Sequence, residues 1–153
     1  MKKLFLFLLA SIALFSSCNS SEIIVEQQAI LANKQCPMSL GSGLTLTKVE
    51  NDSNYFIYYY EGDSNLYSYS QNAATEELKN QVAAQILSQA GTDAASLKFI
   101  NALIELNKGI IYHYYTSSGT AMDVVIEADR LYSEMNSEPV DIDVWENSEI
   151  NNN

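Results

Sequence analysis

The sequence is poor in the residue types on which metal binding and nucleic-acid binding depend. Its 153 residues contain one histidine, two cysteines and 8 basic residues against 19 acidic ones. The histidine, His113, has no second histidine or cysteine at metal-ligand spacing, and two cysteines fall short of the usual zinc ligand set. Phosphate backbones require a basic surface, which this composition does not provide. We therefore expect no metal, no cofactor and no nucleic-acid partner.

The N-terminal segment reads as an export signal and not as part of a fold. Lys2 and Lys3 precede residues 4–15, in which only Ser11 is polar. Twelve residues are too few to span a bilayer as a helix, which needs about 20. Basic residues followed by a short apolar run are typical of a secretion signal, so residues 1–17 are expected to be removed.

The end of this apolar run carries a more specific motif. Leu14, Phe15, Ser16, Ser17 and Cys18 follow one another, and this order resembles the lipobox of bacterial lipoproteins. The resemblance implies cleavage before Cys18, lipid attachment to its sulfur, and anchoring in a membrane of the cell envelope. Phe15 departs from the leucine preferred at its position.

The residue after the cysteine bears on which membrane holds the protein. In the lipoprotein family an aspartate there favours retention at the inner membrane, whereas this chain has Asn19. The resemblance therefore favours the outer membrane. Beyond a polar tether at residues 18–22, residues 23–145 are expected to form a single domain, and residues 146–153 a disordered tail.

The charge of the mature chain narrows the choice of partner. Residues 1–17 contain two lysines and no acidic residue, so their removal leaves 6 basic and 19 acidic residues and a formal charge of −13. Such a surface favours cationic or neutral partners.

Catalytic motifs are scarce. No serine lies in a Gly-x-Ser-x-Gly elbow, and no glycine-rich phosphate loop precedes Lys-Ser or Lys-Thr. Cys36 stands before Pro37, where a lone cysteine is typical of a small buried side chain. The sequence favours a protein that is not an enzyme. The alternative is a small envelope hydrolase that uses Cys36 or His113, which the sequence alone does not bring together.

The periodicity of apolar residues predicts an α+β fold. Helices are expected from Ile23 to near Pro37, from a Thr75 cap to Gly91, from a Thr92 cap to Gly109, and from Ala128 to Met135. Hairpins are expected at 44–50 with 55–61 and at 110–116 with 121–126, a turn at 40–43, and a further strand-like segment at 140–145. Two hairpins, each with an apolar face, predict a two-layer sandwich. Its helices would cover one face of a four- to five-stranded antiparallel sheet, with a helix-hairpin unit that occurs twice.

Tyrosine is the most unusual feature of the composition, because nine of the ten tyrosines fall in the two hairpins or in the segment up to residue 69 that follows the first one. Alternation along a strand places Tyr58 and Tyr60 on one face and Tyr55 and Tyr59 on the other, and it places His113 beside Ile111 and Tyr115. Tyrosine suits contacts with proteins and sugars. We predict that the candidate binding face consists of four residues: Tyr58, Tyr60, Tyr112 and Tyr114. We therefore expect a binding module for a protein or a glycan, with an inhibitor of a cationic envelope protein as its sharper form.

Overall fold

The computed structural model describes residues 20–41, 43–62, 76–90, 93–119 and 121–136. The signal segment with Cys18, the strand-like segment 140–145 and the tail 146–153 lie outside these ranges. The described elements are, in order, α1 (Ser21–Gln35), β1 (Met38–Gly41), β2 (Leu44–Asn51), β3 (Tyr55–Gly62), α2 (Glu76–Ala90), α3 (Ala94–Glu105), β4 (Gly109–Thr116), β5 (Ala121–Ile126) and α4 (Ala128–Met135). Within the described ranges, no helix has the length and apolar character needed to cross a bilayer.

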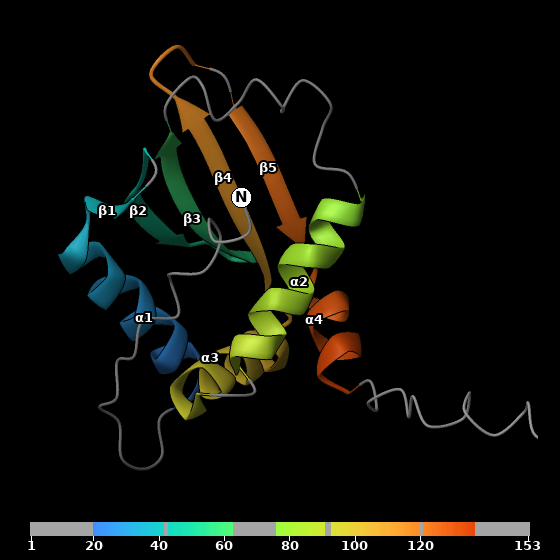
Figure 1. Ribbon diagram of the computed structural model, residues 1–153. Helices are drawn as coiled ribbons and strands as arrows, with labels where there is room; N and C mark the ends of the chain where they lie inside the picture. The colour runs from blue at the N-terminus through green and yellow to red at the C-terminus, as the bar shows by residue number, and fades with distance from the viewer. Residues whose placement is uncertain (1–19, 42, 63–75, 91–92, 120, 137–153) are drawn as a thin grey trace, which may run out of the picture.

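The five strands form one open sheet in the order β1-β2-β3-β4-β5, and the helices pack against it (Figure 1). The predicted α+β class and the mostly antiparallel sheet are confirmed. A helix followed by an antiparallel strand pair occurs twice, as α1 before β2 and β3 and as α3 before β4 and β5. The junction between the two pairs is parallel, because α2 and α3 return the chain so that Gly109 begins β4 beside Tyr55, the first residue of β3.

The core lies between one face of the sheet and the helices. Along β3, Phe56, Tyr58 and Tyr60 are buried, whereas the residues between them are only partly covered. The helices contribute Val25 and Ala29 from α1, Val82 and Ile86 from α2, Phe99, Ile100 and Leu103 from α3, and Leu131 from α4. The alternation predicted for the strands therefore places most of their apolar side chains on the helical side.

Several boundaries differ from the sequence predictions. Helix α3 ends at Glu105 and not at Gly109, which already belongs to β4. Helix α1 already begins at Ser21, so the last two residues of the expected tether belong to it. Residues 38–41 form strand β1, where the glycines at 41 and 43 had predicted a turn that began at residue 40. The N-cap of α3 is Asp93 and not Thr92, since the Asp93 carboxylate accepts hydrogen bonds from the backbone nitrogens of Ala95 and Ser96.

The β1 side of the sheet is closed by a side chain. Strand β1 pairs only with the first part of β2, and its register slips between Ser39 and Gly41. Beyond it, the Asn33 amide of α1 accepts from the Val49 nitrogen at 2.8 Å and donates to the Val49 oxygen at 2.7 Å. Asn33 thus completes the pairing of β2 where no strand of the described ranges lies beside it.

Candidate functional site

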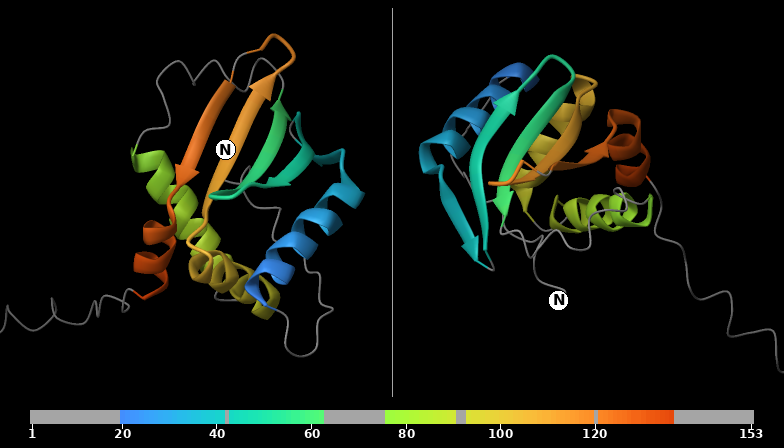
Figure 2. Two further views of the ribbon diagram at one scale, coloured as in Figure 1. Left: turned by 180° about the vertical axis from the view of Figure 1, so that it is seen from behind. Right: turned by 90° about the horizontal axis from the view of Figure 1, so that it is seen from above.

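The face of the sheet turned away from the core is not covered by a described helix; it faces the viewer in the left view of Figure 2, with α2 behind β4 and β5. We call this surface the open face. It consists of Thr45, Thr47, Lys48 and Glu50 of β2, Tyr55, Ile57, Tyr59 and Glu61 of β3, Ile111, His113 and Tyr115 of β4, and Asp123 and Val125 of β5. These residues are partly or fully exposed.

Four side chains form a row across the middle of the open face. The register pairs Lys48 with Tyr59, Tyr59 with His113, and His113 with Asp123. The Lys48 ammonium lies 4.2 Å from the centroid of the Tyr59 ring, and the Tyr59 and His113 rings meet edge to face at 5.1 Å. His113 Nδ1 and Asp123 Oδ1 are 2.5 Å apart. An ionised carboxylate can only accept, so Nδ1 carries the proton in this hydrogen bond.

Glu50 holds one end of the row in place. The Tyr59 hydroxyl donates to Oε2 of Glu50 at 2.6 Å, and Lys48 Nζ lies 2.6 Å from Oε1 of the same carboxylate. The Lys48 hydrogen bond, followed by that from Tyr59, lowers the pKa of Glu50. The same bond to Glu50, followed by burial, raises the pKa of Tyr59 to about 12. Glu50 is therefore a carboxylate and Tyr59 a protonated donor over the whole range in which proteins usually work.

A β-bulge fixes the neighbouring aromatic side chain. The register of β2 against β3 shifts between Leu46 and Lys48, which makes Thr47 the extra residue. Its hydroxyl donates to the backbone oxygen of Tyr59 at 3.1 Å and accepts from the Tyr115 hydroxyl at 2.9 Å. The Tyr115 ring stacks on His113 with centroids 5.9 Å apart. The aromatic side chains of the row are thus held in one arrangement before any ligand arrives.

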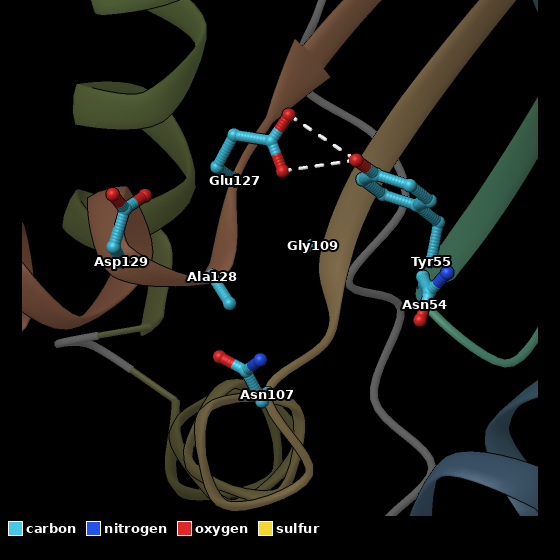
Figure 3. Close-up of a pocket in the computed structure, with 7 residues that line it drawn as sticks. All are labelled: Asn54, Tyr55, Asn107, Gly109, Glu127, Ala128 and Asp129. Atoms are coloured by element: carbon cyan, nitrogen blue, oxygen red, sulfur yellow. Dashed lines mark hydrogen bonds between the residues drawn. The ribbon is translucent and has the colours of Figure 1, made fainter.

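A polar hollow of about 520 Å³ lies at the end of the open face where β3 and β4 begin (Figure 3). Its lining residues are Asn54, Tyr55, Asn107, Gly109, Glu127, Ala128 and Asp129. The Tyr55 hydroxyl donates to both oxygens of Glu127, at 3.0 and 3.2 Å. The hydrogen bond to Glu127 raises the pKa of Tyr55. Tyr55 thus engages one of the two carboxylates of the hollow.

The open face has a negative balance of charge. Its carboxylates belong to Glu50, Glu61 and Asp123, and Lys48 is the one lysine or arginine among the residues that define the face. Lys48 is already paired with Glu50. The Asp123 side chain is 53% exposed at the edge of the sheet, against 28% for His113. The arrangement therefore offers accessible carboxylates and fixed aromatic rings to a positively charged group.

The four tyrosines predicted as a binding face lie on the core side. Tyr58, Tyr60 and Tyr114 are 2, 5 and 5% exposed, and Tyr112 is half-buried against the same core. The parallel register sets Tyr58 beside Tyr112 and Tyr60 beside Tyr114, so the rings stack with centroids 5.4 and 5.1 Å apart. Burial is the main cause that raises the pKa of Tyr58, Tyr60 and Tyr112. This set is packed inside, and the accessible set is the other one.

Cys36 and His113 do not meet. Cys36 packs against the core cluster, and burial raises the pKa of its thiol. His113 lies on the open face, on the opposite side of the sheet. A low-pKa thiolate beside an imidazole, which a cysteine hydrolase needs, is therefore absent from this pair. The described residues contain no group of three or more histidines, cysteines or carboxylates that could hold a metal ion.

The sequence placed Tyr59 with Tyr55 on one face and His113 with Ile111 and Tyr115 on another, but it predicted a role only for His113, in the alternative hydrolase. It missed Lys48 and Asp123 altogether. For Asp123 a signal was present, because it alternates with apolar residues of the predicted strand and a charged residue marks the solvent side. For Lys48 it was not, because simple alternation places it with Leu44 and Leu46, and only the bulge turns it to the open face.

Comparisons with known proteins support the fold and leave the function open. No protein-family model matches the sequence, and no curated protein is similar to it in sequence. A protein of Pseudomonas aeruginosa, described as secreted, has a similar structure with a TM-score of 0.53 at 9% identity, over 76% of this chain and 99% of that one. At this identity the similarity concerns the fold alone.

Two pilotins of type 2 secretion systems resemble the chain more distantly. The pilotin EpsS of Vibrio vulnificus has a TM-score of 0.47 at 15% identity, and the pilotin AspS of Vibrio cholerae has a TM-score of 0.43 at 13% identity. Each alignment covers 72% of this chain and 91% of the pilotin. Nothing about the partner or the activity of this chain follows from them.

Proposed function

We propose that this chain is a lipid-anchored protein of the cell envelope that binds a cationic part of a partner protein through the open face, without catalysis. The observation that carries the proposal is the fixed row Lys48-Tyr59-His113-Asp123, whose single lysine is neutralised and whose outermost member is an exposed carboxylate. Side chains that are already ordered lose little conformational entropy on binding, which favours affinity.

A protein partner fits this surface better than a glycan does. Sugars bind to the flat faces of exposed aromatic rings. Here one face of Tyr59 lies under Lys48, and Tyr115 stacks on His113. Carboxylates beside these rings suit lysine and arginine side chains instead.

The anchor is proposed from the lipobox. With lipid on Cys18, the mature chain would begin two residues before Ser20, the N-cap of α1, and would stay at the envelope, with the outer membrane favoured by Asn19. Mass spectrometry of the native protein tests this directly. The expected result is a diacylated or triacylated Cys18 at the N-terminus; an intact Met1 or an unmodified sulfur would remove the anchor.

The binding role is tested by site-specific photo-crosslinking in the envelope. A photoreactive phenylalanine replaces Ile57 on the open face, and the control carries it at Ser88, an exposed position of α2. We expect a protein adduct from position 57 that is absent from position 88, involves a partner with a basic contact region, and weakens in 0.5 M salt. Equal adducts from both positions, or none from position 57, would refute binding through the open face.

The hydrolase alternative makes a different prediction. If the protein is a hydrolase that uses these side chains, Cys36→Ala or His113→Ala would abolish its hydrolytic activity. If the protein only binds, the wild type should show no hydrolytic activity that either change removes. Binding should tolerate Cys36→Ala, because Cys36 packs against the core away from the open face. An activity of the wild type that disappears in Cys36→Ala would contradict the binding-only proposal.

A further inference from the structure

The two edges of the sheet are built differently. The β1 edge is four residues long, shifts its register, and is completed by the Asn33 side chain. Strand β5 is six residues long, contains no proline or lysine, and pairs with β4 in continuous register from Ala121 to Ile126. Short strands, bulges, prolines and lysines are the devices that protect an edge from pairing with another chain. The β1 edge has two of them, whereas the described part of β5 carries only one charged side chain, Asp123.

The outer edge of β5 carries backbone N–H and C=O groups that can pair with another strand. In an antiparallel ladder, alternate residues turn their N–H and C=O groups away from the neighbouring strand. In the part of the chain that the structure describes, no backbone hydrogen bond reaches β5 from any strand other than β4. In Figure 1 and in the left view of Figure 2, β5 is the outermost strand of the sheet.

The open face continues to this same edge. The row of side chains that starts at Lys48 ends at Asp123 on β5, and the exposed Asp123 carboxylate is its last member. A further strand would place its own side chain next in the row, directly beside Asp123. Opposite charges on neighbouring strands stabilise a sheet and like charges destabilise it, so a lysine or arginine fits that position.

Charge also disfavours a second copy of the chain as the molecule that pairs with the outer edge of β5. Pairing β5 with β5 would bring two Asp123 carboxylates into one small interface. The mature chains would each carry a formal charge of −13, and this charge opposes their association.

We propose that β5 accepts an extended cationic segment of the partner protein as a sixth strand, with a lysine or arginine of that segment beside Asp123. The proposal rests on the binding role of the open face and specifies how the partner binds. Main-chain hydrogen bonds would supply affinity, and the alternate side chains of the segment would supply specificity. Those on the open face would be basic and those on the core side apolar.

The test uses the lipidated mature protein in nonionic micelles and a nine-residue peptide of alternating lysine and valine as the probe. The control peptide has the same sequence with every peptide nitrogen methylated, which keeps its charge and removes its backbone donors. We expect binding of the unmodified peptide, slower hydrogen exchange at the outward amides of β5, and affinity lower by about tenfold or more for the methylated peptide.

Two charge reversals locate the contact. Asp123→Lys should weaken binding by about tenfold, because it replaces an attractive neighbour of the added strand by a repulsive one. Glu61→Lys makes the same change of charge on the same face, two strands away on β3, and should weaken binding less than about threefold, since screening limits its reach. Equal losses from both variants would contradict a contact at β5.

The outcomes separate this inference from the proposed function. Binding that perturbs Ile57 and Ile111, is indifferent to methylation and leaves the β5 amides unprotected would overturn strand addition while the open face remained a binding surface. A β5 edge that is already protected in the protein alone, with dimers at micromolar concentration, would show that a second copy occupies it. Absence of any binding by the probe would also count against strand addition, whereas the crosslinking result at position 57 would stand independently.

Discussion

Gly109 is the position where a single methyl group would disturb both the sheet and the open face. A Cβ atom there would lie 2.6 Å from the backbone oxygen of Ile126 and 2.9 Å from the ring of Tyr55. The ring can turn aside, but the carbonyl belongs to the neighbouring strand and is fixed by the sheet. Gly109 thus lets β5 approach β4 while Tyr55 covers the gap left by the missing side chain.

Gly109→Ala should therefore lower the free energy of unfolding by about 1–3 kcal/mol, the usual cost of overpacking. Urea denaturation followed by circular dichroism measures this. Ser117→Ala, in the exposed turn after β4, serves as the control and should leave the midpoint unchanged. An alanine variant at 109 as stable as the wild type would mean that the strands can separate at this point without cost.

Asn33 makes a second prediction at the scale of one residue. Its amide satisfies both backbone groups of Val49, so Asn33→Ala leaves a partly buried donor and a partly buried acceptor without a protein partner. We expect a loss of about 1–2 kcal/mol in the free energy of unfolding, reduced from the full cost because water can reach the site. Faster hydrogen exchange at the Val49 amide would accompany it.

The neighbouring Lys34→Ala is the matched control, because Lys34 is exposed on the same turn of α1. If Asn33→Ala and Lys34→Ala have the same urea midpoint, Asn33 does not complete the edge of β2.

At the scale of the element, α3 depends on its N-cap. Asp93 accepts from the Ser96 hydroxyl at 2.6 Å and from the Ser96 backbone nitrogen at 3.0 Å. These bonds, that from the hydroxyl first, lower the pKa of Asp93. A carboxyl group whose pKa falls on folding contributes stability that is fully present above its unfolded pKa of about 3.9 and is lost as the pH falls through the folded value.

Asp93→Ala should therefore lower the thermal midpoint at pH 7, and Asp93→Asn, which keeps an acceptor at the cap, should lower it less. The difference between the wild type and Asp93→Asn should shrink towards zero between pH 5 and pH 2, because asparagine does not titrate there. Thermal denaturation at several pH values measures both effects. A difference that is constant with pH would show that the charge of Asp93 adds nothing to the cap.

The elements also differ in how well their own sequence predicts them. The apolar spacing of residues 128–135 predicted α4 with both of its ends, and the turn residues before Tyr55 predicted the β2-β3 hairpin. These are local signals. Strand β1 was not predicted, because the glycines at 41 and 43 indicated a turn and four residues give only a weak strand signal. Its pairing with Leu44 and Leu46 also depends on the strand that follows.

The faces of β3 and β4 show the same limit. Alternation separated Tyr58 and Tyr60 from Tyr59, but both sets are aromatic, so hydrophobicity alone did not say which one faces the helices. Which set faces the helices depends on the strands beside β3. Lys48 and Asp123 become part of the row with Tyr59 only through the register of four strands, and the parallel pairing of β3 with β4 is set by two intervening helices.

At the scale of the whole molecule, the fold separates packing from exposure by placing the helices on one side of the sheet. The core takes the stacked tyrosines, while the carboxylates of the open face lie on the same sheet as β5, whose outer side pairs with no strand in the described ranges. If the chain is tethered at Cys18, the domain also has a defined orientation relative to the membrane. Two residues separate Cys18 from Ser21, so the three Cα–Cα steps between them reach at most about 11 Å.

With lipid on Cys18, the start of α1 would mark the end of the domain that lies near the membrane. The Ser21 hydroxyl donates to the carboxylate of Glu105 at the end of α3, and β4 begins four residues later. Strand β4 then runs from Gly109 to Thr116, about 23 Å at 3.3 Å per residue, towards the orange turn at the top of Figure 1. The turn after β4 is expected to stand farthest from the bilayer.

This orientation is measurable with two fluorescent labels on the lipidated protein, in a Cys36→Ala background that leaves no other free thiol. One label replaces Asn101, an exposed residue of α3 that lines a shallow groove together with Ser21, and the other replaces Ser118 in the turn. In vesicles that carry a headgroup quencher, the label at 101 should be quenched strongly and the label at 118 weakly, because the length of β4 separates them. Stronger quenching at 118 would mean that the domain lies the other way up, with the end of β4 against the membrane, and the partner would then have to approach from the α3 side.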